Sequence, residues 1–143
     1  MTQVAAAIIQ KDDKFLICQR GTGGNCAFLW EFPGGKLEPH ESLKECLIRE
    51  CKEELEIDIS VKGIFAETTY KYPEREIAFT FFDTAIIGGK LKMNVHNDIQ
   101  WVLPRELKNY EFCPADVEIV EKLSEMKAIV YNKLVRDKIP EII

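Results

Sequence analysis

One segment of the chain, residues 34–57, constrains the fold more than any other. Ser42 is a suitable N-cap for a helix, and Glu45 three residues later completes the capping-box pattern. Apolar residues then recur at helical spacing, which predicts an amphipathic helix that runs to about Leu55 and packs one face against a core. The predicted core face contains Leu43, Leu47, Ile48, Cys51 and Leu55.

Three glutamates of the predicted helix, Glu50, Glu53 and Glu54, lie beside its core face. A run of acids is usually a solvated surface, but these like charges crowd the margin of a buried stripe, where they repel one another and lose hydration. Side chains at i, i+3 and i+4 lie close together on a helix, and hard cations such as Mg²⁺ and Mn²⁺ prefer oxygen ligands. We therefore expect the three carboxylates to converge on a divalent metal ion.

Two neighbouring features would support such a metal site. Pro33-Gly34-Gly35 lies just upstream, and its bare backbone allows the Gly34 carbonyl oxygen to turn toward the helix as a neutral ligand. Arg49 lies beside the glutamates, where it is either a surface charge or a bidentate partner that holds one of them in place.

The rest of the chain is predicted to form short strands and a second helix. Asp12-Asp13 predicts a hairpin turn, Pro33-Gly34-Gly35 is expected to stop a strand, and Pro104 is expected to start a helical turn. A last helix is expected to begin near Ala115. This order of elements predicts an α+β fold in which helices pack on a sheet. The predicted strands cover residues 4–9, 14–19, 30–32, 57–61, 64–72, 77–87 and 98–103.

Composition argues against several classes of function. The net charge of −5 argues against binding to nucleic-acid polymers, and residues 41–58 alone carry seven acids and three bases, a net charge of −4. No apolar run is long enough to span a bilayer, and the N-terminus does not resemble a signal peptide, so no membrane partner is expected. The five cysteines form no C-x-x-C pair, which favours free thiols in a reducing cytoplasm and argues against zinc.

The acidic segment resembles the motif of a known family. Gly35, Glu41, the run from Arg49 to Glu54, and Ile57 follow the Nudix box, G-x5-E-x7-R-E-U-x-E-E-x-G-U. Two positions depart from the motif: Cys51 fills a bulky aliphatic position and Glu56 fills a glycine position. Further stretches between residues 3 and 125 resemble the MutT and CTP pyrophosphohydrolase branch of the Nudix hydrolases, and they are residues 4–9, 16–20, 29–39 and 114–116.

The resemblance implies a fold, a reaction and a cofactor. The implied fold is a Nudix-type α/β/α sandwich around a mixed β-sheet, formed by residues 1–126. The implied reaction is hydrolysis of a nucleoside triphosphate to the monophosphate and pyrophosphate, with Mg²⁺ as cofactor and Mn²⁺ as a possible substitute. In this reading the metal ligands are Gly34, Glu50, Glu53 and Glu54, the catalytic residues are Glu53, Glu50 and Arg49, and Glu41 supports the junction of loop and helix.

The resemblance also implies a substrate-binding set. Arg20 would contact the triphosphate, although a surface charge at the end of a strand is an equal alternative. Asp116 would face the base, where a carboxylate accepts a hydrogen bond from an exocyclic amino group, which favours cytosine nucleotides such as CTP, dCTP or a 5-substituted form. Its alternative is a helix cap. The full predicted set is Arg20, Asn25, Glu31, Phe32, Pro33, Gly34, Phe79 and Asp116, with Phe28 and Trp30 as further stacking candidates.

Two parts of the chain depart from the family pattern. Relatives often place an acid in the loop where this chain has Val95; either His96 or Asp98 replaces it, or the site relies on the helix glutamates alone. Residues 127–143 exceed a Nudix domain and resemble the opening of MazG-like pyrophosphohydrolases, so they are either part of a second module or an extension that packs on the domain or on a second subunit.

Several functional alternatives stay open. The main prediction is a cytoplasmic enzyme that removes nucleotides from the precursor pool, as a monomer or a homodimer. An 8-oxo-dGTP diphosphatase, or a hydrolase of nucleotide sugars or dinucleoside polyphosphates, would use the same glutamates on another substrate. A Nudix-like sensor that binds a nucleotide without cleaving it is the alternative of a different class.

Overall fold

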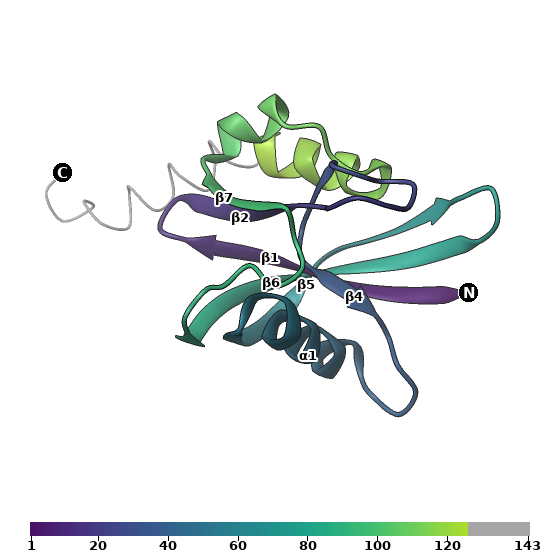
Figure 1. Ribbon diagram of the computed structural model, residues 1–143, viewed down its shortest axis with the longest axis horizontal. Coiled ribbons are helices and arrows are strands. Elements are labelled where there is room, and N and C mark those ends of the chain that lie inside the picture. The colour runs from purple at the N-terminus through teal and green to yellow at the C-terminus, as the bar shows by residue number, and fades with distance from the viewer. Residues whose placement is uncertain (126–143) are drawn as a thin grey trace, which may run out of the picture.

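The computed structural model describes residues 1–125, and they form three layers with a twisted sheet between helices (Figure 1). The expected C-terminal extension, residues 127–143, and its MazG-like resemblance lie outside the described residues. The helices are α1 (Leu43–Leu55), the 3₁₀ helix η1 (Pro104–Asn109) and a C-terminal helix described over residues 114–125. The strands are β1 (Thr2–Lys11), β2 (Lys14–Gln19), β3 (Trp30–Glu31), β4 (Gly34–Lys36), β5 (Ile57–Lys71), β6 (Glu76–Gly89) and β7 (Asp98–Val102).

The sheet is mixed, and β1 lies at its centre. The strand order is β3-β2-β1-β6-β5, with β4 also paired to β1 and β7 to β2. β1 runs parallel to β6, whereas its pairings with β2 and β4 are antiparallel. The predicted hairpin turn between β1 and β2 is confirmed, and Asp12 adopts a φ of 57° there, a left-handed conformation that Asp tolerates. The predicted α+β class, with helices on both faces of a mixed sheet, agrees with this arrangement.

Alternation along the central strands explains why both faces of the sheet are covered. In β1, Ala6 and Ile8 pack toward η1 and the C-terminal helix, whereas Ala5, Ala7 and Ile9 pack toward α1. Adjacent strand residues point to opposite faces, so a strand that is apolar at every position must be buried on both sides. Each face therefore has its own core cluster.

The predicted start of α1 is confirmed in detail. The Ser42 hydroxyl accepts a hydrogen bond from the Glu45 N–H at 3.1 Å, and the Glu45 carboxylate accepts one from the Ser42 N–H at 2.8 Å. At the other end, Glu56 is the C-cap with a φ of 55° in the left-handed region. The family motif has glycine at this position. This chain forms the same left-handed cap with a glutamate, whose Cβ atom makes that backbone conformation strained.

The structure departs from the local predictions at three points. β3 ends before Pro33, as predicted, but a further strand was missed, because Gly34 and Gly35 belong to β4 and pair with Ala6 and Ala5 of β1. The two strands predicted at 57–61 and 64–72 form a single strand, β5, whose pairing with β6 is shifted by irregularities at several points.

The third error concerns the core face of α1. Ile48 is 46% exposed, whereas Cys46, which was not assigned to the core face, is fully buried. Cys46 is buried because its thiol lies against the backbone of β4, with the sulfur 3.5 Å from the Gly35 carbonyl oxygen and 3.4 Å from that of Lys36.

No helix among the described residues is long and apolar enough to cross a membrane.

Candidate active site

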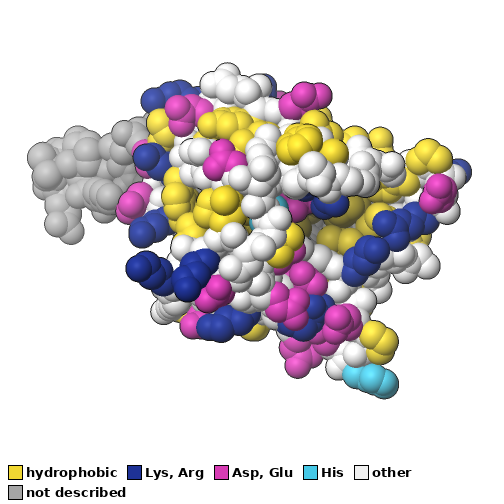
Figure 2. Space-filling view, in the orientation of Figure 1, with side chains coloured by type: hydrophobic (Ala, Val, Ile, Leu, Met, Phe, Trp, Pro, Cys, Tyr) yellow, Lys and Arg dark blue, Asp and Glu magenta, His cyan; other side chains and the backbone are white. Residues whose placement is uncertain are grey.

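A cavity of about 1070 Å³ joins the loop after β2, the strands β3 and β4, the facing ends of β5 and β6, and the start of the C-terminal helix. Glu50 and Glu54 of α1 line it, as do Arg20 and Asp116. Figure 2 shows acidic and basic side chains gathered over α1 and the loop before it, at the bottom of the view. The cavity is therefore charged where α1 borders it.

Glu54 is the α1 glutamate with the most unusual environment. Its side chain is half-buried, and its Oε1 atom is enclosed without any hydrogen-bond partner. The pKa of Glu54 is raised to about 8, chiefly by burial and then by the nearby carboxylates Glu31 and Glu50, against smaller opposing effects of the Gly34 N–H and Arg20. Burying a carboxylate oxygen without a hydrogen-bond partner costs free energy, and none of the described residues offsets this cost for Glu54 Oε1.

Arg49 holds Glu50 and Glu41 in fixed positions. Its guanidinium donates to Glu50 Oε1 at 2.7 Å and to both oxygens of Glu41, at 2.7 and 3.1 Å. Hydrogen bonds from Arg49 lower the pKa of Glu41 to about 2, and Glu41 also accepts from the Glu38 N–H at 2.9 Å. The arginine is therefore a bidentate partner that ties the loop before α1 to the helix, as the family resemblance implied for Glu41.

Gly35 lies directly against the Glu50 carboxylate. A Cβ atom at this position would stand 2.6 Å from both carboxylate oxygens, closer than real Cβ contacts. Gly34 is equally confined, because a Cβ there would overlap the Ala5 carbonyl oxygen. The two glycines allow β4 to pass between β1 and α1, which brings the backbone next to the glutamates.

The expected convergence of Glu50, Glu53 and Glu54 is not found. Within residues 1–125, no three acidic, thiol or imidazole side chains lie close enough together to form a preformed metal site. Glu50 pairs with Arg49, and the side chain of Glu53 is 60% exposed and reaches Arg49 only at 3.4 Å. Spacing on the helix places the three carboxylates on neighbouring positions, but the Arg49 guanidinium draws Glu50 and Glu53 toward itself.

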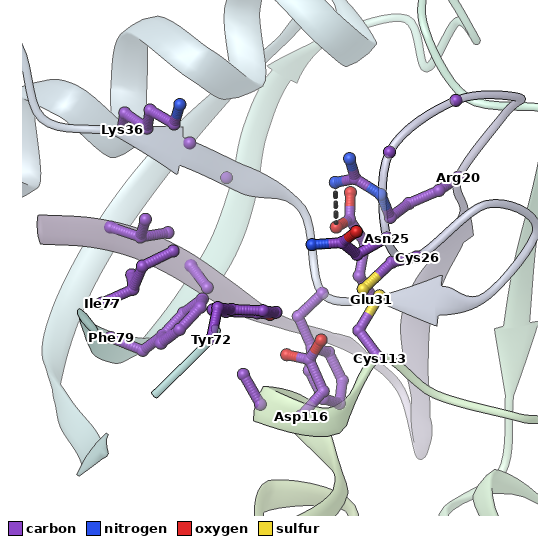
Figure 3. Close-up of a pocket in the computed structure, with 18 of the residues that line it drawn as sticks. Arg20, Asn25, Cys26, Glu31, Lys36, Tyr72, Ile77, Phe79, Cys113 and Asp116 are labelled. Atoms are coloured by element: carbon purple, nitrogen blue, oxygen red, sulfur yellow. Dashed lines mark hydrogen bonds and ion pairs between the residues drawn. The ribbon is translucent and has the colours of Figure 1, made fainter. Parts of the chain in front are cut away.

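A chain of polar contacts crosses the middle of the cavity. Arg20 donates to Glu31 Oε1 at 3.1 Å (Figure 3). On its other side, Glu31 Oε2 lies 3.0 Å from His96 Nε2. The His96 side chain is 3% exposed, and its Nδ1 has no partner among the described residues. Val95 also lines the cavity, whereas Asp98 is bonded to its own strand through the Ile99 N–H at 2.8 Å. Of the two predicted replacements for the loop acid, only His96 lines the cavity.

The far end of the cavity is aromatic and contains one buried acid. Asp116 is 5% exposed, and burial raises its pKa well above the usual range. Figure 3 shows Asp116 below Tyr72, with Phe79 beside them and Asn25 above. This end is suited to a planar, partly polar group such as a nucleobase.

The other predicted substrate-binding residues divide into two groups. Phe32 and Gly34 line the cavity together with Arg20, Asn25, Glu31, Phe79 and Asp116. Pro33 is fully buried, and its carbonyl oxygen accepts from the Ala7 N–H at 2.8 Å, so it shapes β4 without lining the cavity. Trp30 packs edge-on against Tyr110 in the core, and Phe28 is 49% exposed; neither lines the cavity.

Sequence reasoning missed Tyr72, Cys26 and Cys113, which all line the cavity. No local pattern singles out any of them. They come from three separate segments that only the folded chain brings together. The one available signal is that Cys113 immediately precedes the Pro114-Ala115-Asp116 stretch.

Comparisons with known proteins decide the family. A family model described as a NUDIX domain matches residues 4–122. The chain belongs to the Nudix family. The CTP pyrophosphohydrolase of Escherichia coli strain K12 is 36% identical over 128 residues, which are 90% of this chain and 95% of the relative. The 8-oxo-dGTP diphosphatase of the same strain is 27% identical over 125 residues, 87% of this chain and 97% of the relative.

Solved structures of Nudix proteins share the fold. The solution structure of the E. coli ORF135 protein has a TM-score of 0.79 at 35% identity, covering 90% of this chain and 91% of the other. The MutT protein from Methanosarcina mazei Go1 has a TM-score of 0.77 at 25% identity, covering 87% and 93%. The predicted Nudix hydrolase, its MutT and CTP pyrophosphohydrolase resemblance and its Nudix-type fold are therefore confirmed.

The residues of this Nudix hydrolase fit the divalent metal ion that the family implies. The Glu54 Oε1 atom, which has no partner among the described residues, is a hard oxygen ligand that suits such a cation, and the bare Gly35 leaves room for the Glu50 carboxylate beside β4. The Glu53 side chain is 60% exposed. A bound cation would also offset the repulsion among Glu31, Glu50 and Glu54.

Proposed function

We propose that this Nudix hydrolase cleaves nucleoside triphosphates to the monophosphate and pyrophosphate, with Mg²⁺ as its cofactor. One observation supports this above all. A single cavity has glutamates of α1 at one end and a buried acid with aromatic side chains at the other. This layout suits a ligand with a polyanionic part and a planar part. The similarity over most of both chains to a CTP pyrophosphohydrolase supports the same reaction.

The proposed roles follow from the contacts of each residue. Glu50, Glu53 and Glu54, with the Gly34 carbonyl oxygen, would hold the metal. When bound, the metal neutralises phosphate charge and lowers the pKa of a water ligand. Glu53 is the proposed general base, as the family resemblance implies. Its side chain is 60% exposed and reaches Arg49 only at 3.4 Å, so its carboxylate is open to water, although it does not line the cavity as Glu50 and Glu54 do. Arg49 keeps Glu50 oriented.

Arg20 is the proposed phosphate contact. Its side chain is 44% exposed and already pairs with Glu31, so a bound triphosphate would share the guanidinium with that carboxylate. The His96 contact keeps Glu31 in place on its other side. These residues would hold the phosphate chain between the metal ligands and the base.

Asp116 favours a cytosine base. Burial raises the pKa of Asp116 and so favours its protonated form, which offers one donor and one acceptor. The pairing edge of cytosine presents the complementary pair, an acceptor nitrogen and an amino donor. Guanine presents a similar pair at O6 and N1–H, so the choice of cytosine also rests on the similarity to the CTP pyrophosphohydrolase. Phe79 and Tyr72 line the same end and offer apolar surface for stacking.

A substrate panel tests this proposal. We expect kcat/KM for pyrophosphate release to be higher for CTP, dCTP and 5-methyl-dCTP than for dGTP and 8-oxo-dGTP. Asp116→Ala, which removes both the donor and the acceptor, should lower the preference for cytosine by on the order of tenfold, since one good base contact contributes about 1–3 kcal/mol. A parent enzyme that prefers a guanine nucleotide would contradict the role given to Asp116.

An 8-oxo-dGTP diphosphatase is the second candidate. It is favoured by the similarity to the E. coli enzyme of that name over 87% of this chain. Both candidates describe a cytoplasmic enzyme that removes nucleotides from the precursor pool. The same panel distinguishes them, because only the second predicts 8-oxo-dGTP as the best substrate.

A further inference from the structure

Two thiols face each other in the wall of the cavity. Cys26 comes from the glycine-rich loop after β2, and Cys113 comes from the residue before the C-terminal helix. Figure 3 shows the two sulfur atoms next to each other, with each side chain pointing toward the other. The electrostatic and hydrogen-bonding influence of Cys26 on Cys113 agrees with direct contact.

Backbone hydrogen bonds fix this approach. The Trp30 N–H donates to the Glu111 carbonyl at 2.8 Å, and the Trp30 carbonyl accepts from the Cys113 N–H at 2.8 Å. Cys26 is tied to the same strand, because its carbonyl oxygen accepts from the Leu29 N–H at 3.0 Å. The two cysteines are 87 positions apart in the sequence, yet β3 holds both of their segments.

These two cysteines differ from the other three. Cys18, Cys46 and Cys51 are packed in the core between the sheet and α1. Cys26 and Cys113 are 8% and 5% exposed, but both line the open cavity, from which a small reagent can reach them. The proposed hydrolysis uses neither thiol.

We infer that Cys26 and Cys113 form a reversible disulfide when the protein meets a low-molecular-weight disulfide, and that this bond obstructs the nucleotide end of the cavity. The Cys26 thiolate attacks one sulfur of the small disulfide, whose S–S bond breaks and releases one small thiol. The Cys113 thiolate then attacks the Cys26 sulfur and releases the second small thiol. Two electrons pass from the protein to the small disulfide, which leaves as two thiols.

The order of attack follows from the surroundings. Burial and the neighbouring Asp116 raise the pKa of Cys113 well above that of an ordinary thiol, which disfavours its thiolate. Cys26 lies in the loop and is the more accessible of the two. Cys113 therefore acts as the second, resolving thiol.

The bond would act on the base-binding end of the site, and this consequence rests on the proposed function. The Asp116 N–H donates to the Cys113 carbonyl at 2.9 Å, and the Tyr72 hydroxyl interacts with the Cys26 thiol. Joining the sulfurs removes a thiol partner of Tyr72 and ties the Asn25 loop to the helix that carries Asp116. We expect kcat/KM to fall by on the order of tenfold, because displacements of about 1 Å at positioning groups cost up to a hundredfold.

Peptide mapping tests the bond itself. Each of the five cysteines falls in a different tryptic peptide, which makes any linkage unambiguous. After glutathione disulfide treatment and alkylation of the remaining thiols, we expect peptide 21–36 to be linked to peptide 109–122. Cys113→Ser should instead accumulate a glutathione adduct on Cys26, whereas Cys46→Ser, the matched control, should keep the linkage. Separate adducts on Cys26 and Cys113 in the parent, or a linkage between other cysteines, would overturn the inference.

Activity measurements test the consequence. Pyrophosphate release from CTP should fall after oxidation of the parent and return with dithiothreitol. The double variant Cys26→Ser/Cys113→Ser, which can form neither the disulfide nor a glutathione adduct at these positions, should keep its rate after the same treatment. If the fully disulfide-linked protein hydrolyses CTP as fast as the protein with free thiols, the inferred obstruction is wrong. If the reduced protein does not hydrolyse CTP at all, the proposed function fails, and the peptide map still decides the linkage.

Discussion

At the scale of single residues, Glu54 connects stability to pH. Its pKa in the fold is about 8, against an ordinary value of 4.5. Between these values the folded protein keeps a proton that the unfolded chain has released, so this residue lowers the stability as pH rises from about 4.5 to 8. The acid is therefore a cost to the metal-free fold at neutral and alkaline pH.

Glu54→Gln should remove this cost. In metal-free buffer we expect the variant and the parent to have similar melting temperatures at pH 5, and the variant to melt roughly 5 °C or more above the parent at pH 8.5. Thermal unfolding across this pH range measures the difference. Added Mg²⁺ should raise the melting temperature of the parent more at pH 8.5 than at pH 5, since it binds the ionised carboxylate. A constant difference between parent and variant at all pH values would contradict the raised pKa.

Gly35→Ala should disturb the Glu50 carboxylate. The new methyl group would stand 2.6 Å from both of its oxygens, so the carboxylate must move away from β4. We expect kcat to fall by on the order of a hundredfold, in line with the cost of a displacement of about 1 Å at a catalytic group. Gly63→Ala is the matched control, because no atom lies within 4 Å of a Cβ there. Equal kinetics for the two variants would show that the position of Glu50 is unimportant.

Sequence reasoning reached these residues only in part. Spacing on the helix identified Glu50, Glu53 and Glu54, because helical geometry is local. It also predicted that they converge on a metal ion. Among the described residues the three carboxylates do not meet, since the 2.7 Å bond from Arg49 holds Glu50 and draws it toward Glu41. Which of several nearby carboxylates the Arg49 guanidinium binds depends on side-chain conformations, and residue spacing does not determine these.

At the scale of elements, the end of α1 shows a local cost. Glu56 occupies a left-handed conformation, with a φ of 55°, that glycine adopts freely. Its side chain also accepts from Asn94 at 2.9 Å, so a simple truncation removes a contact as well. Comparing two truncations separates the two effects.

Glu56→Gly should be more stable than Glu56→Ala by about 1 kcal/mol, because both lose the Asn94 contact and only glycine relieves the left-handed backbone. Urea unfolding of the two variants measures this difference directly. Equal stability, or a more stable alanine variant, would mean that the conformation of this cap costs nothing.

The elements themselves were predicted unequally well. The capping box and the apolar spacing of α1 act within a few residues, so its start and end were predicted correctly. β4 was missed because three residues with two glycines have little strand propensity, and β1 imposes the pairing. β5 was split in two because residues between Val61 and Ile64 look like a turn, whereas in the fold they form a bulge in a continuous strand.

At the scale of the whole molecule, the order of elements predicts the α+β class, and the continuous apolar run in β1 accounts for its burial on both faces. The cavity could not be derived in this way. Its lining runs from Val4 to Asp116, and its chemistry depends on which distant segments meet. The predicted substrate-binding residues came from the family resemblance, because it relates the glutamates of α1 to distant segments of the chain, which local patterns cannot do.

The domain boundary gives a prediction at this scale. The NUDIX domain model matches residues 4–122. A chain that ends after residue 126 should therefore fold, with kcat/KM for its best nucleotide within about twofold of the full chain. Circular dichroism and pyrophosphate release measure these properties. Loss of cooperative unfolding in the shorter chain would show that residues 127–143 belong to the domain.

The proposed function depends on the cleavage of a nucleoside triphosphate to the monophosphate and pyrophosphate, which product analysis tests directly. With CTP as substrate, the full chain should release CMP and pyrophosphate in equal amounts, and chelation of Mg²⁺ should stop the release. Glu53→Gln should fold normally, since that side chain is 60% exposed, and should lose on the order of a hundredfold or more in rate. Glu121→Gln, an exposed glutamate of the C-terminal helix, should keep the parent rate. Orthophosphate and CDP as products, metal-independent release, or full activity in Glu53→Gln would contradict the account.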